Sequence, residues 1–300
     1  MASGLVLAPL LSGVINRVKA KVAGRRGQPM LQLYYDLAKL RRKGAVYSQT
    51  TTWVFRLVPV LGLAAATMAL LLVPAGTSPA AGRFAGDLFL FAYCLGLMRL
   101  GTVLGALDTG SAFAGMGASR EVQFAAVAEP ALLLAWATLA RLTGSLSLSG
   151  MAAGLAEARS EVAGAVPVIV LVGVALFIVT LAENCRVPFD DPNTHLELTM
   201  VHEAMVLDYS GPDLAAVLYG AALKLWILGA VVVDLAVAAW GWHGTAGAAA
   251  FALGMLLLAA LIGLVESVMA RLSLLRVPRL LVAAGALSLL AFSLTLRSGW

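Results

Sequence analysis

Acidic side chains gather in one stretch of this sequence, between Glu183 and Asp213. The stretch holds seven of the chain's sixteen Asp and Glu residues, and its single Lys or Arg is Arg186. Carboxylates so close together disfavour one another's ionisation, so such a group can take up and release protons. We expect proton handling by Glu183, Asp190, Asp191, Glu197, Glu203 and Asp208. A solvated acidic loop is the alternative, but these acids alternate with leucine, methionine and valine residues.

Further ionisable side chains interrupt apolar runs elsewhere in the sequence. Arg99, Glu129, Lys224 and Asp234 lie inside such runs, and Glu266 lies near the end of one. A charge at the centre of a bilayer costs about 2.5–3.5 kcal/mol, so these side chains must face protein, water or one another. Interhelical ion pairs are the structural alternative to a role in ion movement. For Glu129 we favour ion coupling, because the following proline weakens the helix and gives water a route to the carboxylate.

The composition decides which solvent surrounds these residues. Hydrophobic residues make up 61% of the 300-residue chain and charged residues 12%, with a mean hydropathy of +0.91. So little polar surface cannot cover a soluble globule, which indicates a multi-pass membrane protein. The net charge of +5 then reflects basic residues on one side of a bilayer rather than binding of nucleic acid.

Metal chemistry is not expected in this chain. Its two cysteines, Cys94 and Cys185, cannot supply the four ligands of an iron–sulfur cluster or of a structural zinc site. The HEAMV segment at 202–206 lacks the second histidine of a zinc-protease motif. Any redox metals are therefore expected in partner subunits.

The elements that position these residues are predicted to be membrane-spanning helices. The apolar runs lie at 1–16, 53–73, 84–107, 122–140, 164–182, 214–239, 246–266 and 280–295. They predict an all-α bundle of about eight spans that forms a single membrane domain over 1–300. The first run is short for a span, but the basic residues that follow it favour a membrane anchor over a cleaved signal peptide. Gly101 and Gly105 predict a close helix contact in the third run.

One further helix is predicted to lie at the membrane interface, over 24–43. Apolar residues recur there at helical spacing, while Gln32, Asp36 and Lys39 lie on the opposite face. We expect the apolar face to pack on protein rather than on lipid.

The distribution of basic residues predicts the orientation of the bundle. The connections that would share one side with the acidic stretch carry fourteen Lys and Arg residues, whereas the other connections carry four. This bias predicts that both termini lie outside and that the acidic loop, at about 183–213, is cytoplasmic.

Five segments resemble a known family, and together they extend over nearly the whole chain. They are GQPMLQLYYDLAKL at 27–40, GMGASREVQFAAVAEPALL at 115–133, LAENCRVPFDDPNTHLEL at 181–198, YSG at 209–211 and ESVMARLSLLRVPRLL at 266–281. On these residues the chain resembles the membrane-anchoring subunit shared by respiratory complex I, as its subunit 1, and group 4 membrane-bound hydrogenases, as formate hydrogenlyase subunit 4. The segment between Glu197 and Tyr209 resembles the hydrogenase branch, because it is longer than the usual complex I version.

The resemblance implies a non-catalytic subunit that couples electron transfer to proton or sodium movement in the inner membrane. It implies partners that carry the nickel–iron and iron–sulfur centres, namely the peripheral large and small hydrogenase subunits, and antiporter-like membrane subunits. Gln32, Asp36, Lys39 and Arg186 are expected to dock the peripheral module. The residues that match the family's acidic loop and its buried glutamate are Glu183, Asp190, Glu197, Asp208 and Glu129.

Two other functions stay open at this point. A quinone-site subunit of an NADH–quinone oxidoreductase would bind quinone, which the hydrogenase interpretation does not require. A secondary transporter is the third possibility, but such proteins commonly show internal repeats, and none is evident in this sequence.

Overall fold

The computed structural model describes residues 2–76, 78–161, 164–190, 200–269, 272 and 276–297. Within these residues the chain forms eleven helices: α1 (Ala2–Val22), α2 (Gln32–Arg41), α3 (Trp53–Leu72), α4 (Asp87–Asp108), α5 (Ala112–Thr143), α6 (Leu148–Glu161), α7 (Ala165–Glu183), α8 (His202–Val206), α9 (Gly211–Ala239), α10 (Gly244–Val268) and α11 (Val277–Arg297). Seven of these, α3, α4, α5, α7, α9, α10 and α11, are long and apolar enough to cross a bilayer. The predicted all-α membrane bundle is confirmed.

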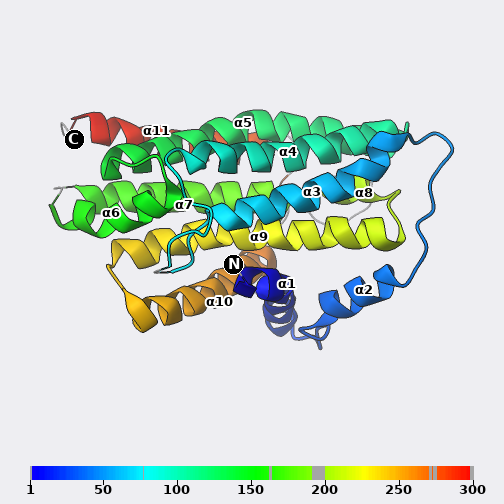
Figure 1. Cartoon of the computed structure of the whole chain (residues 1–300), viewed down its shortest axis with the longest axis horizontal. Helices are drawn as coiled ribbons and strands as arrows, with labels where there is room; N and C mark the ends of the chain where they lie inside the picture. Colours follow the sequence, from blue (N-terminus) through cyan, green and yellow to red (C-terminus); the bar gives the residue numbers. More distant parts are fainter. Residues whose placement is uncertain are drawn as a thin grey trace.

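Most of the long helices run along the longest axis of the molecule, whereas α10 is inclined to it and α1 runs across it (Figure 1). Helix α3 packs most extensively on α4, and α11 packs on α5 and α7, while α1 lies against α9 and α10. A contiguous cluster of buried apolar residues runs through all of these helices. Large apolar side chains also remain exposed on the outside of the bundle, for example Leu257 on α10 and Leu289 on α11. These residues suit contact with lipid.

The first predicted span and the predicted interfacial helix differ most from the structure. Helix α1 continues beyond residue 16 to Val22 and ends in basic residues, and it is not among the seven apolar helices of spanning length. Helix α2 has ten residues and begins only at Gln32. Glycines at 24 and 27 and proline at 29 explain the late start, because both residue types disfavour a helix. Helix α2 contacts α1 and α9, so part of its surface does pack on protein.

Two helical segments extend beyond the predicted apolar runs. Helix α5 begins at Ala112, well before the predicted start at residue 122, and its first turns pack on α8. The connection at 141–163, between the predicted runs at 122–140 and 164–182, contains helix α6. Both extensions are less apolar than the spans, and contacts with neighbouring helices bury one face of each.

Helices α3 and α4 are joined by a cap at the end of the bundle that carries the acidic loop. The carboxylate of Asp108, the last residue of α4, accepts hydrogen bonds from the backbone N–H groups of Thr52 (2.7 Å) and Phe55 (3.2 Å) and from the Thr52 hydroxyl (2.8 Å). Free N–H groups at the start of α3 are thereby satisfied by the neighbouring helix.

The start of α9 is fixed to the same end of the bundle. The ring of Tyr209 stacks on Phe55 of α3 with 4.0 Å between ring centroids, and its hydroxyl donates to the Phe55 carbonyl oxygen. A Cβ at Gly105 of α4 would lie 2.5 Å from that hydroxyl oxygen and 3.4 Å from the Val58 side chain of α3, so space is tight at this glycine. At Gly101 the nearest atoms of α3 would lie 3.8 Å away, which is ordinary contact, so the predicted close helix contact is not seen there. Burial raises the pKa of Tyr209, and nearby Asp213 and Asp108 contribute to the shift.

Helix α1 is held in place by close backbone approaches. A Cβ at Gly13 would overlap the carbonyl oxygen of Met30, in the segment before α2. A Cβ at Gly263 of α10 would lie 2.9 Å from the carbonyl oxygen of Ile15. Neither oxygen belongs to a flexible side chain, so these two positions require glycine for the observed packing.

We therefore predict that Gly13→Ala lowers the stability of the purified protein by about 1–3 kcal/mol, as overpacking of a close contact does. Gly96→Ala on α4 is the matched control, because a Cβ there meets no heavy atom within 4 Å. Thermal unfolding in mild detergent measures both variants. Equal midpoints for the two variants would contradict the tight approach of α1 to the segment before α2.

Candidate ion-coupling site

A guanidinium group lies among carboxylates inside the bundle. Arg99 on α4 forms ion pairs with Glu129 on α5 and with Glu183 at the end of α7. Its Nε lies 3.3 Å from Oε1 of Glu121, which is also on α5. The second oxygen of Glu183 lies 2.9 Å from Nζ of Lys224 on α9. We call these five residues the central ion network, and it joins four spanning helices.

The central ion network reaches from the interior of the bundle to its surface. The side chains of Glu183 and Arg99 are 2% and 8% exposed, whereas that of Glu129 is 51% exposed. Helix α5 continues past Pro130, so Glu129 is exposed by its position on the bundle surface rather than by an end of the helix. Arg99 thus connects a buried carboxylate with one that faces the surroundings of this chain.

A second ion pair group lies where α1 meets α10. The carboxylate of Glu266 lies 2.7 Å from Nζ of Lys19 on α1 and 3.4 Å from a guanidinium nitrogen of Arg186, which follows α7. The Glu266 side chain is 2% exposed, so the two cations compensate a buried charge. Arg186, which the sequence assigned to docking, therefore has a partner within the chain.

Both groups line one large cavity, of about 710 Å³. Its charged lining includes Arg99, Glu121, Glu183, Lys224, Lys19 and Glu266, whereas Glu129 is not part of the lining. Helices α1, α3 and α9 add apolar and small residues, and α2 contributes Gln32 and Asp36, which hydrogen-bond each other at 2.9 Å. The cavity is thus a polar space between the spanning helices, and it extends to the segment after α7 and to α8.

The acidic loop contributes a second layer to the cavity wall. Glu203 and His202 of α8 line the cavity. Each has a buried atom, Oε2 and Nε2 respectively, that has no hydrogen-bond partner in the part of the chain that the structure describes. Asp190 is 2% exposed, and its Oδ2 accepts the backbone N–H groups of Val201 (3.0 Å) and His202 (3.1 Å). Asp190 thereby holds the start of α8 against the cavity.

Not all predicted site residues meet at the cavity. Asp208 and Lys39 lie on the surface, and Asp234 lies near the opposite end of α9 from the acidic loop. Asp191 and Glu197 lie outside the described residues. The structure therefore brings together Arg99, Glu129, Glu183, Lys224, Glu203 and Glu266, and it separates Asp234 from them.

Sequence reasoning missed two charged residues of the site. Glu121 was assigned to a connection, because the predicted span began at residue 122, although its spacing of eight residues from Glu129 places both near one face of a helix. Lys19 was counted only among the basic residues that set the orientation. Its pairing with Glu266 joins segments almost 250 residues apart and has no local signal in the sequence.

Cys185 occupies the junction between the central ion network and the acidic loop. Its Sγ lies 3.7 Å from Oε2 of Glu121, and its backbone has a φ of 48°. Burial raises the pKa of this thiol well above its ordinary value, and the carboxylates of Glu121 and Asp190 add to the shift. Among the described residues, no group of three or more His, Cys, Asp or Glu side chains is placed to hold a metal ion.

The fold and the site define a class: a multi-pass membrane protein whose spanning helices share a buried ion network beside a polar cavity. Comparison with known proteins is consistent with this class. The chain is 33% identical to hydrogenase-4 component C of Escherichia coli (strain K12) over 233 residues, which cover 77% of this chain and 71% of the relative. It is 30% identical to formate hydrogenlyase subunit 4 of the same organism over 298 residues, or 95% and 93% of the two chains.

Residues 1–296 match the family model described as NADH dehydrogenase, and the chain therefore belongs to this family, that of complex I subunit 1. This confirms the resemblance inferred from the sequence motifs. In fold, the chain is similar to a chain in the structure of the membrane-bound sulfane sulfur reductase, an archaeal respiratory membrane complex. The TM-score is 0.80 at 18% sequence identity, and the match covers 97% of this chain and 95% of the other.

The environment of Cys185 predicts low thiol reactivity. With Cys94→Ala as background, we expect Cys185 to react with a maleimide at neutral pH at least about tenfold more slowly than a cysteine introduced by Ser48→Cys at an exposed position, since only the thiolate reacts. Its rate should still rise above pH 9, where an ordinary thiol levels off, and this separates a raised pKa from simple obstruction. Labelling at the rate of the exposed control would contradict the assignment.

Proposed function

We propose that this protein is the membrane-anchoring, ion-coupling subunit of a membrane-bound hydrogenase or formate hydrogenlyase-like complex. It links electron transfer in peripheral subunits to translocation of protons or sodium ions. The observation that carries the proposal is the central ion network, because it connects a buried polar cavity with a carboxylate on the membrane-facing surface. The similarity to formate hydrogenlyase subunit 4 and hydrogenase-4 component C supports the same function.

The charge balance of the central ion network suits coupling. Three carboxylates, of Glu121, Glu129 and Glu183, share two cations, of Arg99 and Lys224. When every group is ionised, one negative charge lacks a counter-ion, so one carboxylate is available to bind a proton or another cation. Because neighbouring charges shift one another's proton affinity, a change of charge at one end of the network alters occupancy at the other.

The geometry suggests a direction for this coupling. Glu203 and Glu121 lie on the side of the acidic loop, Glu183 lies beside Lys224 in the interior, and Glu129 lies on the bundle surface. Arg99 contacts a carboxylate on each side, so its guanidinium can shift its pairing toward whichever carboxylate is ionised. A charge change at the acidic loop can therefore be passed on to Glu129 without movement of a helix.

The proposed partner subunits would bind at the two ends of this route. The peripheral large and small hydrogenase subunits, with their nickel–iron and iron–sulfur centres, would dock on the acidic-loop end and on α2, where Lys39 and Asp208 are exposed. An antiporter-like membrane subunit would cover Glu129, because a half-exposed carboxylate in a spanning helix is costly against lipid. The chain would hold no redox cofactor of its own. The proposed location is the inner membrane, with the acidic loop in the cytoplasm.

A second candidate function is quinone binding, as in an NADH–quinone oxidoreductase. The cavity favours it, since about 710 Å³ lies within the range of small-molecule sites and part of the lining, such as Val58, Leu63 and Met98, is apolar. The charges around the same cavity favour an ion route instead. The two functions differ in the acceptor that the whole complex uses.

Replacing the carboxyl of Glu129 tests the ion-coupling role. Glu129→Gln keeps the shape and can still accept a hydrogen bond from Arg99, but it cannot ionise. We expect the complex to assemble and to transfer electrons, while ions translocated per electron fall several-fold in membrane vesicles. Glu157→Gln, at an exposed position on α6, is the matched control. Full coupling in Glu129→Gln would reduce this residue to a structural partner of Arg99.

The choice between the two acceptors is tested on the purified complex. We expect hydrogen evolution or uptake that is insensitive to quinone-site inhibitors, because no quinone is reduced under the hydrogenase interpretation. Quinone-dependent turnover without hydrogenase activity would instead establish the NADH–quinone oxidoreductase function. Identification of the co-purified subunits by mass spectrometry provides an independent check.

A further inference from the structure

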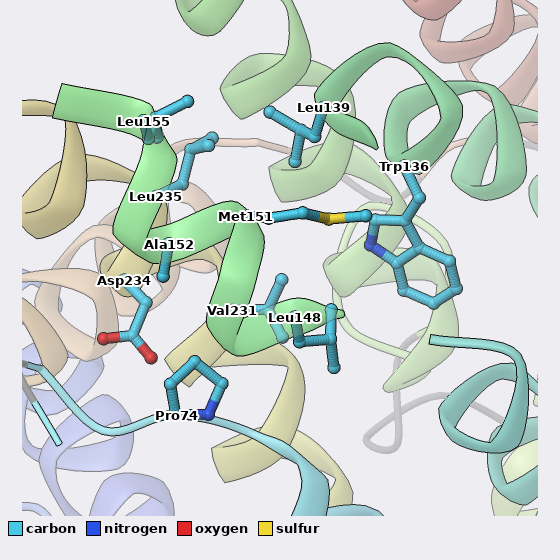
Figure 2. A pocket seen from close by; sticks show the side chains of 10 residues that line it. All are labelled: Pro74, Trp136, Leu139, Leu148, Met151, Ala152, Leu155, Val231, Asp234 and Leu235. Atoms are coloured by element: carbon cyan, nitrogen blue, oxygen red, sulfur yellow. The ribbon is translucent and has the colours of Figure 1, made fainter. Parts of the chain in front are cut away.

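A second, much smaller cavity lies at the end of the bundle opposite the acidic loop. It has a volume of about 40 Å³ and lies between α5, α6, α9 and the segment that follows α3. Figure 2 shows its lining, in which Leu, Met, Val, Ala, Pro and Trp side chains surround one carboxylate, that of Asp234 on α9. Asp234 is thus the only titratable side chain in this lining.

Asp234 is buried, and its two carboxylate oxygens differ in their hydrogen bonding. The residue is 4% exposed, and its Oδ1 accepts a hydrogen bond from the backbone N–H of Gly76 at 2.7 Å. Its Oδ2 is buried and has no hydrogen-bond partner among the described residues, and the same holds for the indole Nε1 of Trp136, which lines the same cavity. In Figure 2 the carboxylate lies on the Pro74 side of the cavity, and Met151 extends toward the Trp136 ring.

The surroundings of Asp234 disfavour an ionised carboxylate. An isolated charge in an apolar interior is far costlier than a neutral polar group, and the cavity lining holds no cation. Charged or titratable residues on the packed elements, such as Arg83, Glu157 and His243, do not line the cavity either. A bound metal ion is equally unsuited, because hard cations require several oxygen ligands and the lining offers one carboxylate.

Asp234 is also separated from the central ion network along α9. Lys224 lies ten residues earlier, about 15 Å along the helix axis, and residues 225–233 between them are all apolar or glycine. The segment after α3 covers Asp234 on the other side, where Gly76 packs closely on Gly247 of α10. The nearest aqueous phase is therefore the one at this end of the bundle.

We propose that Asp234 is a resident proton-binding site that is independent of the central ion network. The carboxyl is held as the neutral acid, with Oδ1 accepting from Gly76 and the proton on Oδ2. That proton is donated to water in the adjacent cavity, whose volume exceeds the 10–15 Å³ or so that one water molecule needs. The site does not rest on the proposed function, because it follows from burial and hydrogen bonding alone.

Infrared spectroscopy of the whole purified complex tests the protonation directly. The carbonyl band of a protonated carboxyl shifts on exchange into D₂O, and we expect Asp234→Asn to remove one such band at neutral pH. Loss of a carboxylate band instead, or no loss of a protonated band, would overturn the proposal.

Assembly and stability provide the second measurement. We expect Asp234→Asn to assemble with an unchanged or higher melting midpoint, because the amide is neutral and its oxygen can accept from Gly76. Asp87→Asn is the contrasting control: both Asp87 oxygens accept at 2.8 Å, from the Ser147 hydroxyl and the Leu148 N–H. An amide has one oxygen and can keep only one of these bonds, and the Ser147 hydroxyl would have to turn and become the acceptor, so we expect a lower midpoint. A complex that fails to assemble with Asp234→Asn would indicate an ionised carboxylate paired with a partner's cation, which overturns the proposal.

Measurement of ion translocation distinguishes the site at Asp234 from the coupling route. Asp234→Asn should translocate as many ions per electron as the unaltered complex, whereas Glu129→Gln should not. A fully assembled but uncoupled Asp234→Asn complex would place Asp234 within the route and refute its independence. Failure of Glu129→Gln to uncouple would count against the proposed function and leave the proton site at Asp234 standing.

Discussion

The structure depends on one guanidinium group that compensates three carboxylates inside a membrane bundle. Without Arg99, Lys224 would be the remaining cation beside Glu183 in the central ion network. Glu121 and Glu129 would lose the cation that they share. Removing one partner of a buried ion pair is costly, because an uncompensated charge remains in a medium of low dielectric constant. The ion pairs therefore fix the positions of α4, α5, α7 and α9 relative to one another. Apolar packing alone would allow these helices to adopt many other relative positions.

The placement of the cavity follows from this arrangement. Buried charges require polar surroundings, and the cavity supplies them along one side of the network. Helix α1 closes that side, and its Lys19 shares with Arg186 the compensation of the buried Glu266 carboxylate on α10. The close backbone contacts at Gly13 and Gly263 leave no room for α1 to move nearer to α10 or to the segment before α2, because main-chain atoms form these contacts rather than side chains that could rotate.

Much of this architecture was predictable from local sequence patterns. Long apolar runs identified the spanning helices, and ionisable residues within them identified Arg99, Glu129 and Lys224, since such residues are too costly to face lipid. Helix α6 and the first turns of α5 were not predictable in this way, because their amphipathic character is weak and their burial depends on neighbouring helices. Glu121 and Lys19 were missed for the same reason: each acquires its role from a residue that is distant in sequence. For Asp234 the local sequence was misleading. Like Lys224 it lies within an apolar run of α9, but the structure places it away from the central ion network.

The cap that Asp108 provides for α3 has a consequence for how the chain enters the membrane during synthesis. The N–H groups of Thr52 and Phe55 obtain their acceptor from the end of the very next spanning helix, and α3 and α4 also pack on each other more extensively than any other pair. A hairpin of these two helices can therefore satisfy the start of α3 as soon as both helices are in the membrane, without a contribution from α5 or any later helix. Arg99 must still await its partners, because the carboxylates of Glu121, Glu129 and Glu183 are all synthesised later. The backbone hydrogen bonds at the start of α3 can therefore form well before the charge of Arg99 is compensated.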